Sequence, residues 1–243
     1  MRFCGVDPTT LHKAISIAKE IPPGMVKRNI YRVRGNRGDV VGGVEEESDE
    51  YIVRVNIAGS DAREAWAVRA MLAGWACAGG KQGARLEPTH WPGVYYDAIC
   101  SHIDPPEFKP RFVTVEVAFL LPSGEAMSLA ERERSGTNEG TQIRIGGTRN
   151  AHMRLLLTMS KAASGVSIAM DGVNIAGVTS DVKAGDEIEF DFAAGSLTIN
   201  GAHAESRIDV LRTDWLAEFA PGAHTITASA AAGVKARWRE AWA

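Results

Sequence analysis

Apolar and polar residues alternate along much of this chain, with the two-residue period that is typical of β-strands. In residues 51–57, four apolar side chains at the odd positions alternate with Ile52, Arg54 and Asn56. Residues 112–119 repeat the pattern with Phe and Val on one face. Each segment therefore predicts a strand with one buried face.

A single long segment follows the helical period instead. Between residues 60 and 80, four apolar side chains fall at intervals of three and four: Ala65, Val68, Leu72 and Trp75. These positions share one face of a helix. Ser60 or Asp61 can cap its start, and Gly79 with Gly80 ends it. We expect one helix among the strands of the first half.

The second half consists almost entirely of short alternating segments separated by turn residues. In residues 187–192, Ile188 and two phenylalanines alternate with acidic residues, and the pair Asn200-Gly201 is a strong hairpin signal. Strands at such regular spacing predict a β-sandwich. The polar, glycine-containing stretch 122–140 separates the halves. We therefore predict a mainly β protein with domains at 1–124 and 125–243.

Composition narrows the functional classes. The 243 residues carry 27 basic and 30 acidic side chains, a net charge of −3, which does not favour binding to nucleic acid. Apolar runs stay below the roughly 18 residues of a membrane span, and residues 1–10 lack the apolar core of a signal peptide. We expect Cys4, Cys77 and Cys100 to be reduced thiols in a protein made in the cytoplasm.

Catalytic and metal-binding motifs are missing from the sequence. The six histidines form no His-x-x-x-His unit, and no serine stands in a Gly-x-Ser-x-Gly turn. The row Glu187, Glu189 and Asp191 could bind calcium or act as glycosidase carboxylates. However, its alternation with buried residues already explains it as a solvated strand face. We expect no enzyme activity, no metal and no cofactor.

Two features are candidates for contact with partners. Residues 35–50 combine glycines with a run of charges, which predicts a long exposed loop or a loosely paired ribbon. Trp91 and Trp215 stand in predicted loops, where an exposed indole could contact a sugar.

The order of the segments resembles the distal tail proteins of phages with long, flexible, non-contractile tails. Residues 51–80 are similar to that family's strand-then-helix unit. Residues 84–103 resemble its following hairpin, and residues 111–122 its closing strand before the linker. In the second half, the stretch from Asn200 to Trp238 is similar to the last three strands. A departure is His224, which stands where the family commonly has asparagine.

The resemblance implies a tail-tube-like β-sandwich or barrel with one helix, followed by a galectin-like, jelly-roll sandwich similar to carbohydrate modules. It implies a structural protein that forms a hexameric ring at the virion tail tip after synthesis in the bacterial cytoplasm. Such a ring would join the tail tube protein to the hub, the baseplate or the host-recognition apparatus, without catalysis. Charged residues of the loop would then contact neighbouring subunits or rings: Arg34, Arg37, Asp39, Glu45, Glu46 and Glu47.

Other interpretations remain open. The second domain could act as a carbohydrate-binding module or lectin-like adhesin that recognises a host surface glycan. A glycoside hydrolase could use Glu187 and Glu189 on a sandwich scaffold. A tail tube subunit is a further alternative, although that family usually has one domain.

Overall fold

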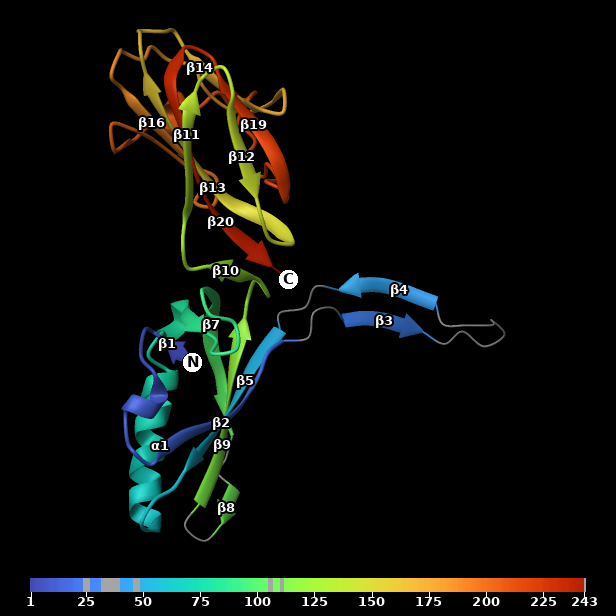
Figure 1. Cartoon of the computed structure of the whole chain (residues 1–243), viewed down its shortest axis with the longest axis vertical. Helices are drawn as coiled ribbons and strands as arrows, with labels where there is room; N and C mark the ends of the chain where they lie inside the picture. The colour runs from blue at the N-terminus through green and yellow to red at the C-terminus, as the bar shows by residue number, and fades with distance from the viewer. Residues whose placement is uncertain (24–26, 32–39, 46–48, 105–106, 110–111, 243) are drawn as a thin grey trace. The chain divides into compact units, whose positions relative to one another are not determined.

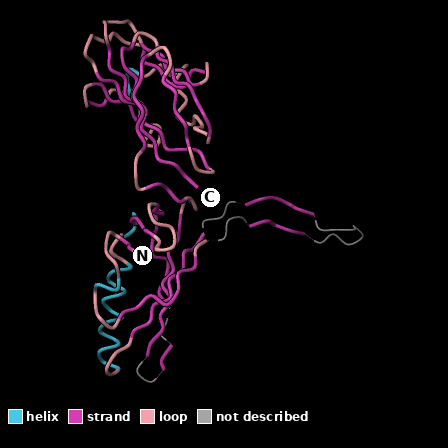
Figure 2. The backbone as a smooth tube through the Cα atoms, viewed as in Figure 1, coloured by secondary structure: helices cyan, strands magenta, loops and turns pink. Residues whose placement is uncertain are grey.

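The computed structural model describes residues 1–23, 27–31, 40–45, 49–104, 107–109 and 112–242 (Figure 1). The chain divides into two compact units, Met1–Ala126 (unit 1) and Met127–Trp242 (unit 2). Strands dominate both units, and the described residues contain a single α-helix (Figure 2). The predicted mainly β fold class is therefore confirmed.

Unit 1 is built on an antiparallel sheet in the order β2-β5-β9-β7. Shorter strands extend it: β6 pairs with β7, β1 with β6, and β8 with β9. The strands are β1 (Arg2–Phe3), β2 (Ile15–Ile21), β5 (Asp49–Ile57), β6 (Ala84–Glu87), β7 (Val94–Ile103), β8 (Glu107–Lys109) and β9 (Phe112–Leu121). The odd-numbered side chains of β5, from Tyr51 to Ile57, are fully buried, as their alternation predicted.

The single α-helix, α1 (Ala62–Ala76), begins and packs as its sequence predicted. Asp61 is the N-cap, and its side chain accepts a hydrogen bond from the backbone N–H of Glu64 at 2.8 Å. The Glu64 carboxylate in turn accepts one from the backbone N–H of Ser60 at 2.6 Å. This reciprocal arrangement satisfies donors that a helix start leaves open.

The buried stripe of α1 holds the helix on unit 1. It consists of the predicted residues and one more: Ala65, Val68, Leu72, Trp75 and Ala76. The ring of Trp75 meets Phe3 and Phe119 edge-on, at centroid distances of 5.9 and 5.8 Å. Its indole N–H donates to the carbonyl of Val6 at 3.0 Å. Packing this large aromatic side chain ties the helix to the sheet and to the first strand.

Part of the glycine-rich, charged segment forms a ribbon. Strand β3 (Lys27–Tyr31) pairs antiparallel with β4 (Val40–Glu45) as a separate two-stranded sheet. Residues 40–45 thus form a strand, one of the two forms predicted for this stretch.

Unit 2 contains two antiparallel sheets. One runs β18-β17-β16-β13-β20, with β11 on the free side of β20, and the other runs β12-β19-β14-β15. The strands are β10 (Ala126–Ser128), β11 (Arg132–Thr137), β12 (Thr141–Ile145), β13 (Arg149–Met159), β14 (Val166–Met170), β15 (Val173–Val178), β16 (Glu187–Asp191), β17 (Ser196–Ile199), β18 (Ala202–His203), β19 (Gly222–Ala228) and β20 (Ala231–Trp242). Short 3-10 turns lie at Pro8–Thr10, Gly80–Gln82 and Glu205–Arg207.

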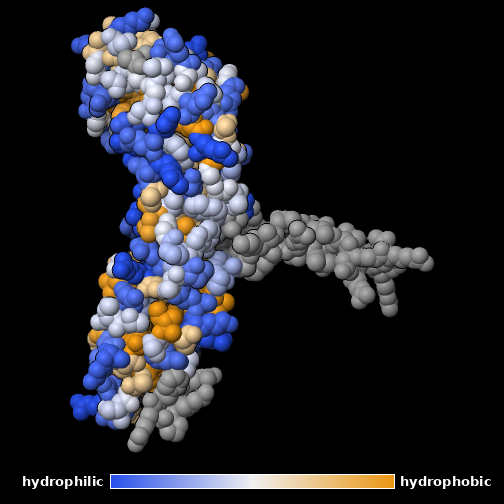
Figure 3. Space-filling model, viewed as in Figure 1, coloured by the Kyte–Doolittle hydropathy of each residue, from blue (hydrophilic) through white to orange (hydrophobic). Residues whose placement is uncertain are grey.

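The core of unit 2 is formed by side chains from both sheets, among them Leu155, Ile168 and Phe190. The turn between β17 and β18 has the predicted hairpin form, because Asn200 and Gly201 adopt positive φ angles of 51° and 76°. The Asn200 side chain also accepts a hydrogen bond from the backbone N–H of Glu187 at 2.9 Å. On the face shown in Figure 3, hydrophilic residues cover most of this unit.

Candidate functional site

One residue of the acidic row of β16, Glu189, forms an ion pair with a basic side chain. Glu187, Glu189 and Asp191 alternate with the buried Ile188 and Phe190, as predicted. Arg154 on the neighbouring strand lies 3.8 Å from Glu189 and also binds Glu131. In the part of the chain that the structure describes, there is no group of three or more His, Cys, Asp or Glu side chains that could hold a metal ion.

The two predicted sugar-contacting tryptophans lie in different units. Trp91 is half-buried in the loop between β6 and β7 of unit 1. Trp215 is half-buried in unit 2, where its ring lies 5.7 Å from that of Phe192 and 6.2 Å from that of Phe190. Much of the Trp215 surface therefore packs on the core. The sugar contact of both residues stays a prediction.

The predicted inter-ring residues fall mostly outside the described residues. This holds for Arg34, Arg37, Asp39, Glu46 and Glu47.

The remaining member of that set, Glu45, is the last residue of β4, where its backbone pairs with Lys27. Its role between rings stays a prediction.

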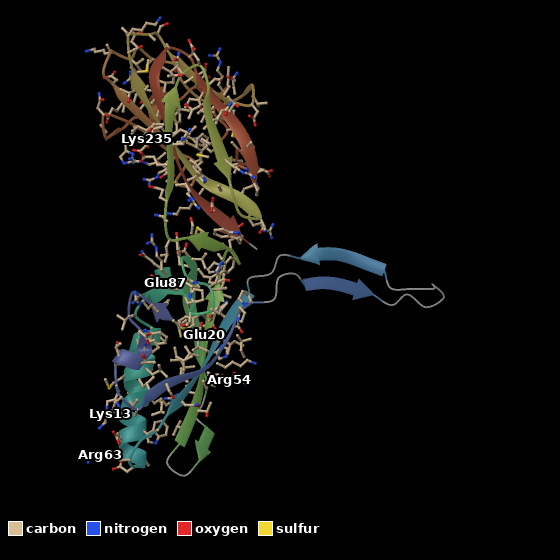
Figure 4. The ribbon with its side chains drawn as sticks, in the orientation of Figure 1. Lys13, Glu20, Arg54, Arg63, Glu87 and Lys235 are labelled. Atoms are coloured by element: carbon tan, nitrogen blue, oxygen red, sulfur yellow. The ribbon has the colours of Figure 1, made fainter. Side chains whose placement is uncertain are left out.

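A buried polar cluster fastens the edge of the sheet in unit 1. The carboxylate of Glu20, which lies on β2 (Figure 4), accepts hydrogen bonds from the Tyr51 hydroxyl at 2.6 Å and the Thr89 backbone N–H at 3.0 Å. Burial opposes ionisation of Glu20, but these bonds stabilise the carboxylate and lower its pKa. Burial and the Glu20 charge both raise the pKa of Tyr51. The Tyr51 phenol therefore stays protonated and donates its hydrogen bond to Glu20, which links β5 to β2.

Large apolar side chains are exposed on both units. On α1, Trp66 and Met71 face solvent, and the Arg69 guanidinium lies 5.5 Å from the centre of the Trp66 ring. Before β19 in unit 2, Val210, Leu211 and Leu216 are at least 80% exposed. Single exposed side chains of this kind are common on protein surfaces, whereas a contiguous apolar patch is characteristic of surfaces that contact other proteins.

One cavity of about 540 Å³ lies in unit 2, at the side where the edge strands β11 and β12 meet. Residues of β11, β12, β19 and β20 line it: Glu133, Arg134, Gln142, Ile143, Arg144, Ala223, His224, Thr225 and Trp238. The Trp238 side chain is only 6% exposed. The sequence did not predict the cavity, because its lining comes from residues as far apart in the chain as Glu133 and Trp238.

The electrostatics of the cavity are dominated by cations. Nδ1 of His224 lies 2.7 Å from the Asp171 carboxylate, and its Nε2 lies 2.8 Å from the carbonyl of Ala220. Partial burial lowers the pKa of His224, but these two acceptors outweigh burial and raise it above the ordinary value. The hydrogen bond to His224 in turn lowers the pKa of Asp171. Both ring nitrogens face acceptors, which favours the doubly protonated cation.

The acid in the cavity wall is already neutralised. Glu133 lies 2.8 Å from the Nε of Arg237 and 3.3 Å from the Nζ of Lys235. These hydrogen bonds lower the pKa of Glu133, so it stays ionised and paired. Arg134 and Arg144, in contrast, form no ion pair with any residue that the structure describes.

Across the described residues, no helix has both the length and the apolar character needed to cross a membrane.

Comparison with known proteins shows which tail proteins this chain resembles. Residues 146–242 match the model of the siphovirus-type tail component, C-terminal domain. No curated protein matches the chain by sequence.

Solved structures extend the comparison to the whole chain. The Dit protein of phage SPP1, described as a paradigm of the hub adsorption apparatus in phages that infect Gram-positive bacteria, superposes with a TM-score of 0.83 at 11% identity. The alignment covers 100% of this chain and 98% of SPP1 Dit. A chain of the phage P2 baseplate in its activated conformation with calcium gives 0.54 at 11% identity, over 93% and 90% of the two chains. The resemblance to distal tail proteins is thus confirmed: the chain has the fold of SPP1 Dit, and its residues 146–242 match the model of the siphovirus-type tail component.

Proposed function

We propose that this protein is a structural component of the phage tail tip and has no catalytic activity. The observation that carries the proposal is the end-to-end likeness to SPP1 Dit, together with the family match of residues 146–242. Fold likeness alone does not define function. Here it agrees with a sequence that has no catalytic motif and with exposed apolar side chains suited to protein contacts.

In this proposal unit 1 forms a hexameric ring, and unit 2 is a galectin-like sandwich attached to it. Strand β2 pairs only with β5 among the described strands, so it offers one edge to another subunit. A closed ring pairs such edges and removes the aggregation hazard of a free edge. The exposed Trp66 and Met71 on α1 supply apolar area for the same contact.

One face of the ring would join the tail tube protein and the other the hub or baseplate, which places the protein at the virion tail tip. The charged segment from Arg34 to Glu47 is suited to contacts between rings, because charge complementarity sets register and partner choice more than affinity.

The ring is tested by native mass spectrometry of the purified full chain over a range of concentrations. We expect a species of six times the 26.1 kDa chain mass. In the variant Trp66→Ala/Met71→Ser this species should weaken, whereas the exposed control Arg212→Ala should leave it unchanged. A monomer at every concentration, also in the presence of a tail tube protein, would refute the ring.

The contact between rings has a separate test. Deleting residues 38–48 should leave both units folded by circular dichroism and the single ring intact. Stacking on a tail tube or hub protein in co-sedimentation should be lost. Undiminished stacking would contradict the role of the charged residues from Asp39 to Glu47.

A second candidate function is recognition of a host surface glycan through Trp215. The observation in its favour is that this half-buried indole lies beside the exposed Leu216. A glycan array with the full chain tests it. Binding that disappears in Trp215→Ala and persists in Trp91→Ala would support this function, and an array without binding would contradict it.

A further inference from the structure

The cavity of unit 2 contains a buried hydrogen-bond donor without a partner. Trp238 lines the cavity and is 6% exposed, and its Nε1 has no hydrogen-bond partner among the described residues. Leaving a buried donor unpaired destabilises the folded protein. In a core position phenylalanine would avoid this cost, so the indole N–H calls for an acceptor oxygen that enters the cavity.

The register of the strands places a guanidinium beside this indole. Arg134 pairs with Ala236 on β20, two residues from Trp238, and directly paired residues point to the same face of a sheet. Arg134 therefore extends from the same face of the sheet as Ala236, and its side chain is exposed at the edge strand β11. The donor of Trp238 and the cation of Arg134 therefore serve the same cavity.

The exposed face of β12 and β19 adds a second cation and two neutral hydrogen-bonding groups to the cavity lining. Gln142 pairs with Thr225 and Arg144 with Ala223 across β12 and β19. The amide and the hydroxyl thus lie side by side, and the small Ala223 leaves room beside the Arg144 side chain. The cavity lining thus carries two cations that are unpaired among the described residues, Arg134 and Arg144, and a histidine paired with Asp171, against one already paired acid, in a chain of net charge −3.

We propose that this cavity binds a saccharide that carries a carboxylate. The carboxylate is held by Arg134 and Arg144, since guanidinium groups bind carboxylates with geometric specificity. Ring hydroxyls exchange hydrogen bonds with Gln142 and Thr225, and a sugar oxygen accepts from the Trp238 indole N–H. The volume of about 540 Å³ suits a ligand of one or two sugar rings.

An acidic peptide strand fits these observations less well. A strand that adds to a sheet edge binds through backbone N–H and C=O groups along that edge. The donors described above are mainly side chains, and one of them lies below the surface. A compact ligand with many oxygen atoms matches this arrangement, and an extended peptide would leave the Trp238 donor unsatisfied.

The test uses the purified full chain on an array of oligosaccharides that contain glucuronate, galacturonate or sialate, together with their neutral methyl esters and an acidic hexapeptide. We expect saturable binding of at least one carboxylate sugar and at least tenfold weaker binding of its methyl ester. Equal binding of the ester, stronger binding of the peptide, or no binding of any acidic sugar would overturn the proposal.

Matched variants then locate the site by titration calorimetry with the best ligand. Arg134→Ala/Arg144→Ala should abolish measurable binding, and the control Arg212→Ala, an exposed arginine of the same unit, should retain it. Trp238→Phe keeps an aromatic ring without the donor, so it should bind roughly tenfold more weakly while its melting temperature is unchanged or higher. Full affinity in Trp238→Phe would overturn the assignment. Native mass spectrometry of the same variants reports ring formation separately.

Discussion

At the scale of single residues, the alternation of side chains was predictable and their pairing was not. Tyr51 and Ile188 are buried as their strand positions predicted. However, Tyr51 bonds Glu20 across 31 residues, and His224 bonds Asp171 across 53. Local periodicity contains no information on such distant partners. The family departure at His224 was visible in the sequence, yet its charge follows only from the acceptors around it.

The ion pair between His224 and Asp171 predicts a pH dependence of unit 2 stability. The pKa of His224 is raised by folding, so its contribution is complete below about 6.5 and is lost as pH rises through the folded value. The pKa of Asp171 is lowered, so its contribution exists above about 3.8 and is lost as pH falls through the folded value. The pair therefore stabilises most between these limits. Arg144, on the neighbouring strand, adds a like charge that opposes His224 protonation.

We expect His224→Gln to lower the urea midpoint more at pH 5.5 than at pH 8.5, measured by fluorescence. His203→Gln is the control, because its ion pair with Glu205 is exposed and screened. A His224→Gln effect of the same size at both pH values would contradict the assigned charge.

The cysteines predict unequal thiol reactivity. The pKa of the Cys100 thiol is raised to about 11, chiefly by burial. The charge of Cys77 and the hydrogen bond between the two cysteines add to this rise. Since the thiolate is the reactive form, Cys100 should react most slowly with Ellman's reagent at pH 8. Cys100→Ser should remove the slow phase and leave the rapid reaction of the exposed Cys4. Loss of the rapid phase instead would refute this order.

At the scale of elements, boundaries with local chemical causes were predictable. The helix starts at Asp61 because the Asp61 side chain caps its first turn. The chain turns at Asn200-Gly201 because these two residue types readily adopt positive φ angles. Both causes lie in the local sequence. The ribbon of β3 and β4 was only partly specified, since glycine-rich strands fix their register weakly. Which strand pairs with which across distant sequence was not predictable.

The N-cap offers a test at this scale. Asp61→Ala removes the acceptor for the Glu64 N–H and should lower the free energy of unfolding by about 1 kcal/mol, measured by chemical denaturation. Arg63→Ala, two residues further along the same helix, should change the free energy of unfolding by less than about 0.5 kcal/mol. Equal effects of the two substitutions would show that capping does not stabilise α1.

At the scale of the whole molecule, each compact unit has its own core. The core of unit 2 extends from Ile143 to Trp238 and draws on both of its sheets. A segment that buries its own apolar surface can fold alone. We therefore expect the fragment 125–243 to unfold in one cooperative calorimetric transition. A fragment with no transition, or with dye binding typical of exposed apolar surface, would contradict independent folding of the predicted second domain.

The sequence by itself determined the mainly β class, the single helix with its cap, and the buried face of each long strand, because these depend on side-chain periods of two and 3.6 residues. Its order of segments also indicated the distal tail protein resemblance. Only the tertiary structure decided that β11 and β12 lie together at one side of a sandwich, with Arg134, Arg144 and an unpaired Trp238 donor around one cavity. Strand pairing between distant segments sets that arrangement, and it depends on the packing of the complete core.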